Sequence, residues 1–259
     1  MRQINDSILA SKKSIINNFD FAVIVPMANE EKNFNLFVEP LVKVLNMLDC
    51  GMVYFIVDKV STDNTLGMCR LLSQRDNRFI SIWAPENKNV VDAYMRGYKE
   101  ALKNGHKIII EMDAGLSHDP RALPMFLRVL HEGNECAFGC RFINGGSILD
   151  STWKRTFLSK FGTILANVLL GIKMHDATSG FQGFQAHIVK KFLTYDLLSS
   201  FHFYQTELRY LLRNTRYIEV PIHYRSPSPR VSAKSILNAL RVLLHYFLLR
   251  LRFKSPSIN

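Results

Sequence analysis

Residues 107–120 read KIIIEMDAGLSHDP, and they combine a strand pattern with the start of a helix. Residues 107–112 form a mostly apolar run of the length of one β-strand. Asp119 followed by Pro120 is a favourable helix start, because Asp is a good N-cap and Pro suits the first helical position. Asp113 comes directly after the strand. The stretch therefore predicts a strand–loop–helix unit with a carboxylate at the carboxyl end of the strand.

The same unit recurs through the first half of the chain. Four more short apolar runs are strand candidates: residues 21–26 (FAVIVP), 52–57 (MVYFIV), 79–83 (FISIW) and 135–140 (ECAFGC). Segments with helical periodicity alternate with the strands, at residues 31–48, 62–74, 90–104 and 120–131. Apolar strands separated by helices are typical of a parallel sheet that is covered on both faces. We therefore predict an α/β fold with a doubly wound, mostly parallel sheet.

After residue 140 the pattern changes and helices dominate. Helices are expected at residues 153–170, 187–198, 203–213 and 232–253, with one short strand at 217–220. Polar loops at 141–150 and 171–184 and a basic loop at 224–234 join them. We divide the chain into an N-terminal extension (1–19), a main domain (20–231) and a C-terminal amphipathic helix (232–259).

The final helix, ILNALRVLLHYFLLRLRF at residues 236–253, is very apolar but carries three arginines and a histidine. One interpretation is a helix lying at a bilayer interface, with its arginines meeting lipid phosphates. The other is a helix packed on the core of the domain or in a dimer. The sequence leaves both open, and it leaves the oligomeric state open as well.

Charge and composition limit the classes of partner. The chain has 33 Lys and Arg against 22 Asp and Glu, a net charge of +11, and 47% of its residues are hydrophobic. Such a surplus favours a phosphorylated ligand, an anionic membrane surface or a nucleic acid. The basic residues are scattered and form no nucleic-acid-binding motif, so we expect no nucleic acid partner.

The cysteines and the hydropathy pattern predict the compartment. The four cysteines show no metal-ligand spacing, which is typical of reduced residues in a cytosolic protein. Residues 1–20 lack the apolar core of a signal peptide, and no apolar run reaches about 18 residues, the length of a spanning helix. We expect a cytoplasmic protein, either soluble or peripheral on the cytosolic face of a membrane.

Polar residues follow the predicted strands at one edge of the sheet. Ligands of parallel sheets bind beyond the carboxyl ends of the strands. The residues at these positions are Asn29 and Glu30, Asp58, Glu86 and Asn87, and Asp113. Each of the four positions therefore places a carboxylate at the same edge, which predicts a polar ligand site there.

Several sequence blocks, in order, resemble family 2 glycosyltransferases, specifically the dolichyl/polyprenyl-phosphate mannose synthase branch. They are VPMANEE (25–31), FIVDKVSTDNT (55–65), MDAGLSHDP (112–120), GCRFINGG (139–146), WKRTFLSKFGTILANVLL (153–170) and DATSGFQGF (176–184), followed by YQTELRYLLRN and IEVPIHYR. The resemblance runs from about residue 20 to residue 247 and implies a GT-A-like fold that binds a nucleotide-sugar. Two departures concern the donor site: Gly115 and Lys59 stand where the family has aspartates.

The resemblance also implies the roles of individual residues. Asp113 would hold Mg²⁺ or Mn²⁺ on the donor diphosphate, and Asp113, Arg141 and Asp176 would form the catalytic group. Donor-binding residues would be Pro26, Asn29, Glu30, Asp58, Asn87 and Asp113, and substrate-binding residues would be Arg141, Gln205, Glu207, Arg230 and Lys234. Each has a purely structural alternative: turn or cap residues for the Asp, Asn and Glu positions, and surface residues for the basic ones.

The implied reaction is inverting transfer of a sugar from a GDP- or UDP-sugar to a polyprenyl or dolichyl phosphate. A phosphate monoester is already anionic near neutral pH, so it needs cations more than a general base. Basic groups such as Arg230 and Lys234 suit that acceptor. One alternative is a transferase that extends a saccharide on a hydroxyl acceptor, with Asp176 or Glu207 as base. Another is a nucleotide-sugar-binding protein that has lost catalysis.

Overall fold

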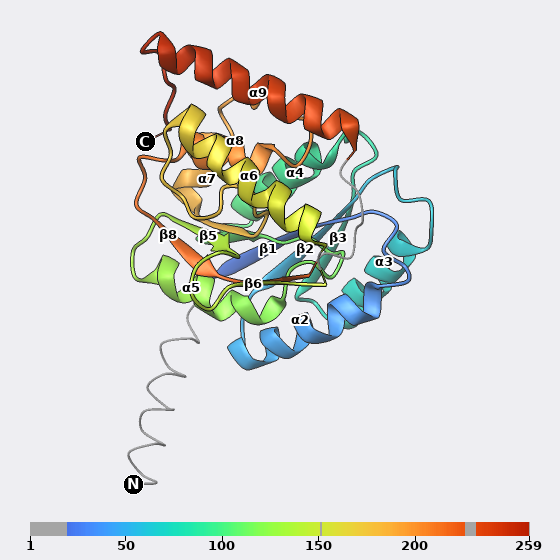
Figure 1. Cartoon of the computed structure of the whole chain (residues 1–259). Helices are drawn as coiled ribbons and strands as arrows, with labels where there is room; N and C mark the ends of the chain where they lie inside the picture. Colours follow the sequence, from blue (N-terminus) through green and yellow to red (C-terminus); the bar gives the residue numbers. More distant parts are fainter. Residues whose placement is uncertain (1–19, 151, 226–231, 259) are drawn as a thin grey trace, which may run out of the picture.

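The structure, a computed structural model, describes residues 20–150, 152–225 and 232–258 of the 259-residue chain. The expected N-terminal extension lies outside these ranges. Seven of the described strands form one sheet in the order β3-β2-β1-β4-β7-β5-β8 (Figure 1). The strands are β1 Phe21–Met27, β2 Met52–Val57, β3 Phe79–Trp83, β4 Ile108–Glu111, β5 Cys136–Cys140, β7 Gln182–Gln185 and β8 Tyr217–Pro221.

The sheet is parallel except at one strand. β7 pairs antiparallel with both β4 and β5, while all the other neighbouring strands pair in parallel. The α/β class and the mostly parallel sheet that the sequence predicts are therefore confirmed. Two more short strands, β6 Ser147–Leu149 and β9 His223–Arg225, form a separate parallel pair.

Helices cover both faces of the sheet (Figure 1). One core lies beneath α2, α3 and α5, and the other beneath α4 and the later helices, including α9. Residues of β1 alternate between the two cores, because successive side chains of a strand point to opposite faces. The helices are α2 Phe34–Leu48, α3 Thr65–Arg75, α4 Val90–Lys103, α5 Leu123–His131, α6 Trp153–Leu170, α7 Ala186–Phe192, α8 Tyr204–Leu211 and α9 Ala233–Leu251.

Three details differ from the pattern in the sequence. Residues 182–184, the end of the predicted polar loop 171–184, belong to β7, and β6 and β9 were not predicted. The helix expected at residues 120–131 begins with a 3-10 turn, Pro120–Ala122, which Asp119 caps by accepting from the backbone N–H of Arg121. The helix expected at residues 187–198 ends at Phe192. Short strands carry too few residues for a period-2 pattern to stand out.

The final helix packs on the domain with one face. Val242, Leu243 and Tyr246 are buried in the core that also contains α4 and α8. None of the four cysteines, all of which are described, is in a disulfide bond. Among the described residues, no helix combines the length and the hydropathy needed to cross a membrane.

Gly97 sets the distance between α4 and the sheet. A Cβ atom at this position would lie 2.1 Å from Cγ2 of Ile24 on β1. We expect Gly97→Ala to lower the free energy of unfolding by about 1–3 kcal/mol, because the helix must move away from the strand. Gly162→Ala on α6 is the control, since its Cβ would make an ordinary 3.4 Å contact with Thr178. Chemical denaturation that ranks Gly97→Ala as the more stable variant would contradict this account.

Candidate active site

A cavity of about 340 Å³ lies at the carboxyl ends of β1, β2 and β4. Its wall includes Pro26 near the end of β1, Glu30 after β1, Asp58 after β2, and Asp113 after β4. The chain reaches this edge at the ends of three strands because parallel strands all end on the same side. Four of the predicted donor-binding residues are thus brought together in one cavity, which α4 and the loop at residue 202 complete through Tyr94 and His202.

Asp113 is held by Tyr94 and His118. Its Oδ1 accepts from the Tyr94 hydroxyl at 2.6 Å, and its backbone N–H donates to Nδ1 of His118 at 3.0 Å. With Nδ1 accepting, a neutral His118 carries its proton on Nε2, which lies 3.7 Å from Asp113 Oδ2. Burial raises the pKa of Asp113, but His118, His202 and Tyr94 together hold that pKa below its ordinary value. The side chain remains 31% exposed, so an ionised carboxylate oxygen faces the cavity.

Asn29 joins the two loops that form one wall of the cavity. It has a left-handed backbone, with φ of 58°, a conformation that Asn adopts more readily than most residues. Its side-chain amide donates to the carbonyl of Val60 at 3.0 Å and accepts from the N–H of Thr62 at 2.9 Å. The next residue, Glu30, donates its N–H to the Thr65 hydroxyl at 2.8 Å. Asn29 therefore holds the loop after β1 against the loop after β2. Of these two neighbouring residues, Glu30 lines the cavity and Asn29 does not.

Asp58 both stabilises a turn and lines the cavity. One of its oxygens accepts from the N–H of Val60 at 2.9 Å in a tight Asx-type turn, and the residue also lines the cavity. Lys59, beside it, is exposed. Asn87 lies apart from the cavity lining and is 5% exposed, and its side-chain N–H₂ has no hydrogen-bond partner among the described residues.

Arg141 and Asp176 form a buried ion pair behind the cavity. Nε of Arg141 lies 2.6 Å from Asp176 Oδ2, and Nη2 lies 2.8 Å from Oδ1, so the pair is bidentate. Burial raises the pKa of Asp176, but its bonds to Arg141 hold that pKa below the ordinary value. The guanidinium also lies 5.2 Å from the ring of Tyr224, which in turn contacts His118. Arg141 therefore adjoins the Asp113 region through aromatic neighbours and does not line the cavity.

A chain of buried polar groups continues from this pair across the sheet. Arg209, which is fully buried, donates to the backbone carbonyls of Asp176 and Ser179 and, at 3.0 Å, to Gln182 Oε1 on β7. The Gln182 amide donates to Glu111 at 2.7 Å. The chain thus runs from Arg141 to Glu111, two residues before Asp113.

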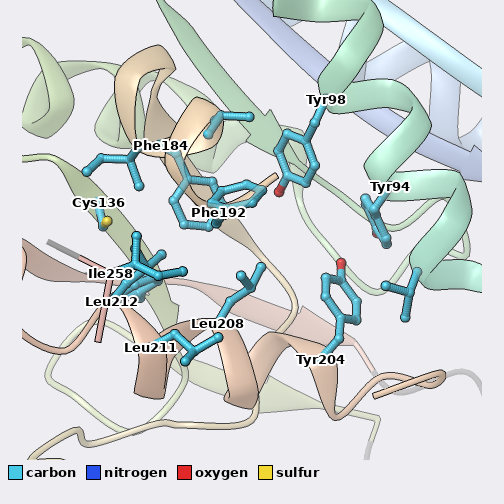
Figure 2. Close-up of a cluster of buried hydrophobic side chains, with 14 of the residues drawn as sticks. Tyr94, Tyr98, Cys136, Phe184, Phe192, Tyr204, Leu208, Leu211, Leu212 and Ile258 are labelled. Atoms are coloured by element: carbon cyan, nitrogen blue, oxygen red, sulfur yellow. The ribbon is translucent and has the colours of Figure 1, made fainter. Parts of the chain in front are cut away.

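Glu111 is surrounded by hydroxyl donors. Tyr98 of α4 and Tyr204 of α8 donate to its carboxylate at 2.6 and 2.7 Å, and Figure 2 shows these tyrosines with Tyr94 on facing helices. Burial raises the pKa of Glu111 to about 7, although its three side-chain donors lower it. The rings of Tyr94 and Tyr204 lie 5.5 Å apart, so the donor to Asp113 packs on a donor to Glu111.

The remaining predicted residues lie elsewhere. Glu207 is fully buried and accepts from the N–H groups of Leu198 and Ser199 and from the Tyr246 hydroxyl, so it ties α8 to a loop and to α9. Gln205 is 4% exposed and packs against Gly180, with no partner in the described part of the chain for its N–H₂. Lys234 is exposed on the first turn of α9. Arg230 lies outside the described residues.

Sequence reasoning missed several residues of this region. Tyr94, Tyr98 and Tyr204 lie in helical segments where a periodic apolar pattern accounts for them without a polar role. His202 belongs to a loop with no motif of its own. These side chains are distant from Asp113 and Glu111 in sequence, and only the fold brings them together. His118 and Ser117 had a visible signal, because they belong to the same motif as Asp113.

Within the described ranges, no group of three or more His, Cys, Asp or Glu residues could hold a metal ion by itself. An added Cβ at Gly115 would meet only Glu30 Oε1, at 3.6 Å, so the cavity has room where the second aspartate of the family motif would stand. One ionised carboxylate on an open cavity suits a cation that takes most of its ligands from phosphate and water.

The parallel sheet with one antiparallel strand, and the acidic cavity at its carboxyl edge, define a GT-A-type glycosyltransferase fold. Comparison with known proteins agrees. The sequence model for glycosyl transferase family 2 matches residues 22–193. The chain belongs to glycosyl transferase family 2 and is a glycosyltransferase.

Two curated relatives share most of the chain. The polyprenol monophosphomannose synthase of Mycolicibacterium smegmatis is 29% identical over 217 residues, which are 82% of this chain and 80% of that protein. The undecaprenyl-phosphate mannosyltransferase of Micrococcus luteus is 24% identical over 203 residues, 78% of this chain and 82% of that protein.

Solved structures share the fold at low identity. Glucosyl-3-phosphoglycerate synthase of Mycobacterium tuberculosis in complex with UDP has a TM-score of 0.65 and 14% identity, over 91% of this chain and 83% of that one. The same enzyme with Mg²⁺ and UDP gives a TM-score of 0.62 and 14% identity, over 95% and 84%. At this identity the likeness concerns the fold.

The buried ion pair should be coupled in stability. We expect Arg141→Met and Asp176→Leu each to lower the free energy of unfolding by about 3–5 kcal/mol, because each leaves a buried charge unpaired. The double variant should lose less than the sum, since it leaves neither charge. Chemical denaturation of the four proteins measures the coupling, and additive losses would show that the two residues act independently.

Proposed function

We propose that this glycosyltransferase moves a sugar from a GDP- or UDP-sugar to a polyprenyl or dolichyl phosphate, with inversion, on the cytosolic face of a membrane. The observation that carries the proposal is the ionised carboxylate of Asp113 in a cavity at the carboxyl edge of the sheet. The names of the two curated relatives, which describe mannosyl transfer involving polyprenol phosphates, support the acceptor class.

The cavity suits the donor. Asp58 and Glu30 offer acceptors for ribose or base hydroxyl and amine groups, and Pro26 gives the wall an apolar surface. Asn29 acts indirectly, by fixing the two loops that carry these residues. The carboxylates would repel a diphosphate unless a cation stood between them.

Asp113 would hold that cation, Mg²⁺ or Mn²⁺, together with phosphate oxygens and water. When bound, such an ion offsets the negative charge that develops on the departing nucleoside diphosphate. The Tyr94 hydroxyl and His118 keep the Asp113 carboxylate ionised and oriented. Structures of a fold neighbour with Mn²⁺ or Mg²⁺ and UDP agree with this role.

In the transfer step an oxygen of the acceptor phosphate attacks the anomeric carbon. The new carbon–oxygen bond forms on the face opposite the diphosphate, the bond to the diphosphate oxygen breaks, and the nucleoside diphosphate leaves with the electron pair. The acceptor is already anionic, so no proton has to be removed.

The two candidate bases for a hydroxyl acceptor are poorly placed. Asp176 is fully buried and bidentately paired with Arg141, which holds its pKa below the ordinary value. The Glu207 oxygens accept from three donors in the core. Neither carboxylate lines the cavity of Asp113. This arrangement favours a phosphate acceptor over a saccharide hydroxyl.

A transfer assay tests the function directly. Purified protein with Mg²⁺ or Mn²⁺ is given a panel of radiolabelled GDP- and UDP-sugars and a short-chain polyprenyl phosphate. We expect label to move into the organic phase with one donor. Nucleotide binding without any transfer would favour the saccharide acceptor or the protein that has lost catalysis.

Asp113→Asn should remove metal-dependent donor binding. The amide keeps an oxygen for the Tyr94 hydroxyl but loses the charge that a cation requires. We expect the affinity for the preferred nucleotide with Mn²⁺ to fall about tenfold or more, a change of about 1.4 kcal/mol for each factor of ten. The affinity without metal should not fall. Calorimetry measures both, and Asp119→Asn is the control, because that carboxylate caps a turn and pairs with Arg121. An unchanged affinity would exclude Asp113 from the site.

Gly115→Asp should strengthen metal use. The cavity has room at this position, and a second carboxylate would stand beside Glu30 Oε1. We expect the Mn²⁺ concentration for half-maximal nucleotide binding to fall several-fold, because Mn²⁺ and Mg²⁺ favour carboxylate ligands. Gly115→Asn, of the same size without the charge, should change it little. Equal behaviour of the two variants in a titration with Mn²⁺ would contradict this interpretation of Gly115.

A further inference from the structure

Exposed apolar side chains are concentrated on α6 and α9. Each helix carries six large hydrophobic residues that are at least 41% exposed. On α6 they are Trp153, Phe157, Leu158, Phe161, Ile164 and Val168, and on α9 they are Ile236, Leu237, Leu240, Leu244, Leu248 and Leu251. Exposed apolar patches of this extent mark interaction surfaces.

The exposed residues follow helical spacing on both helices. On α6, residues 153, 157, 161, 164 and 168 are separated by three or four positions, and so are residues 237, 240, 244, 248 and 251 on α9. Such spacing places each set on one side of its helix. The opposite sides, with Ala166 and Leu170 on α6 and Val242 and Tyr246 on α9, are buried in the core.

The two helices form one surface, here called the α6–α9 face. They pack side by side and run in the same direction (Figure 1). At their carboxyl ends, Arg250 of α9 donates to the carbonyls of Val168 and Leu169 at 2.8 and 3.0 Å. The α6–α9 face is therefore part of the folded domain, although it remains exposed.

The charge of the α6–α9 face selects its partner. Neither helix contains an Asp or a Glu. Exposed basic residues on the helices and just beyond α9 are Lys154, Lys160, Lys234, Arg241, Arg250, Arg252 and Lys254. A second copy of the same face would bring only positive charges together. An anionic lipid surface attracts each basic residue by about 1 kcal/mol and accepts apolar side chains as well.

We infer that the α6–α9 face docks the protein on an anionic lipid bilayer, with the apolar side chains of both helices inserted at the interface. The inference rests on the proposed function, since it supplies the surface from which a lipid phosphate is taken. It extends the expected membrane contact from the final helix to α6, whose Trp153 and Phe157 are 74% and 62% exposed.

The α6–α9 face is connected to both ends of the site. The Phe142 ring lies between the Lys160 ammonium of α6, at 5.5 Å, and the Arg141 guanidinium, at 5.1 Å. On the other helix, Asn238 accepts from the N–H of Ser200, in the loop that brings His202 to the cavity. Docking through this face would hold the site beside the lipid headgroups. Basic side chains would then extend from the membrane surface towards the site.

Vesicle binding of the full chain tests the inference. The probes are vesicles of phosphatidylcholine alone and of phosphatidylcholine mixed with phosphatidylglycerol, in a sedimentation assay. We expect the mixed vesicles to bind at least about tenfold more tightly, with the preference lost at high salt. Phe157→Gln combined with Leu244→Gln should weaken this binding about tenfold.

Matched variants separate the face from general properties of the surface. Leu36→Gln with Met47→Gln removes two equally exposed apolar residues from α2, 62% and 57% exposed, and should leave vesicle binding unchanged. Lys154→Gln with Arg241→Gln should reduce the preference for anionic vesicles, whereas Lys190→Gln with Lys191→Gln on α7 should not. Circular dichroism checks that each variant is folded.

Three outcomes would overturn the inference: no binding of the wild type to anionic vesicles, equal losses in the α2 and α6–α9 variants, or a dimer that the α6–α9 variants dissociate. Transfer to the short-chain phosphate, measured in parallel without vesicles, tests the proposed function separately. Transfer without vesicle binding would contradict the proposed docking surface and leave the proposed function in place. Vesicle binding without transfer would leave the surface in place and remove the function.

Discussion

The burial of the Arg209 guanidinium is the constraint on which the site depends. A buried charge is tolerated only where hydrogen-bond acceptors surround it. Arg209 has them because β7 enters the sheet antiparallel between β4 and β5, bringing Gln182 within 3.0 Å and the loop carbonyls of residues 176 and 179 into reach. Gln182 then bonds Glu111 on β4, and the loop at residue 176 holds Arg141. One buried cation thus fixes the distance between two sides of the active site.

Such a buried network can hold a site in a fixed geometry when the site is built from separate loops. Asp113, Glu30 and Asp58 follow three different strands, and none of them is positioned by its neighbours in sequence alone. Tyr94 orients Asp113 from α4, and Asn29 joins the loops of the other two. Because α4 packs on β1 through Gly97, a shift of that helix would carry Tyr94 with it. Packing outside the cavity therefore controls the orientation of the Asp113 carboxylate.

The sequence predicted the fold more completely than it predicted the hydrogen-bond partners of individual side chains. Apolar strands alternating with helices determine a covered parallel sheet, and the residues after those strands had to meet at one edge. Asp113, Asp58 and Glu30 were found in this way. Strand β7 escaped because four residues, two of them glutamines and one a glycine, carry no readable period. The role of Glu207 escaped because Glu on a short helix is normally exposed, and only the approach of Tyr246 on α9 explains its burial.

The distribution of charge separates the two phosphorylated substrates of the proposed reaction. Carboxylates line the cavity proposed for the donor, so a diphosphate would enter only with a cation that offsets them. The α6–α9 face contains exposed basic groups, so an acceptor phosphate on that side would need no metal. The same division would keep each anion from the other's position. Gly115 leaves the cavity with one carboxylate fewer than the family motif has, but it adds no positive charge. The cavity therefore remains acidic and the α6–α9 face remains basic. In the proposed reaction, a chain with a net charge of +11 would retain an acidic centre because the donor, unlike the acceptor, would arrive with its own cation.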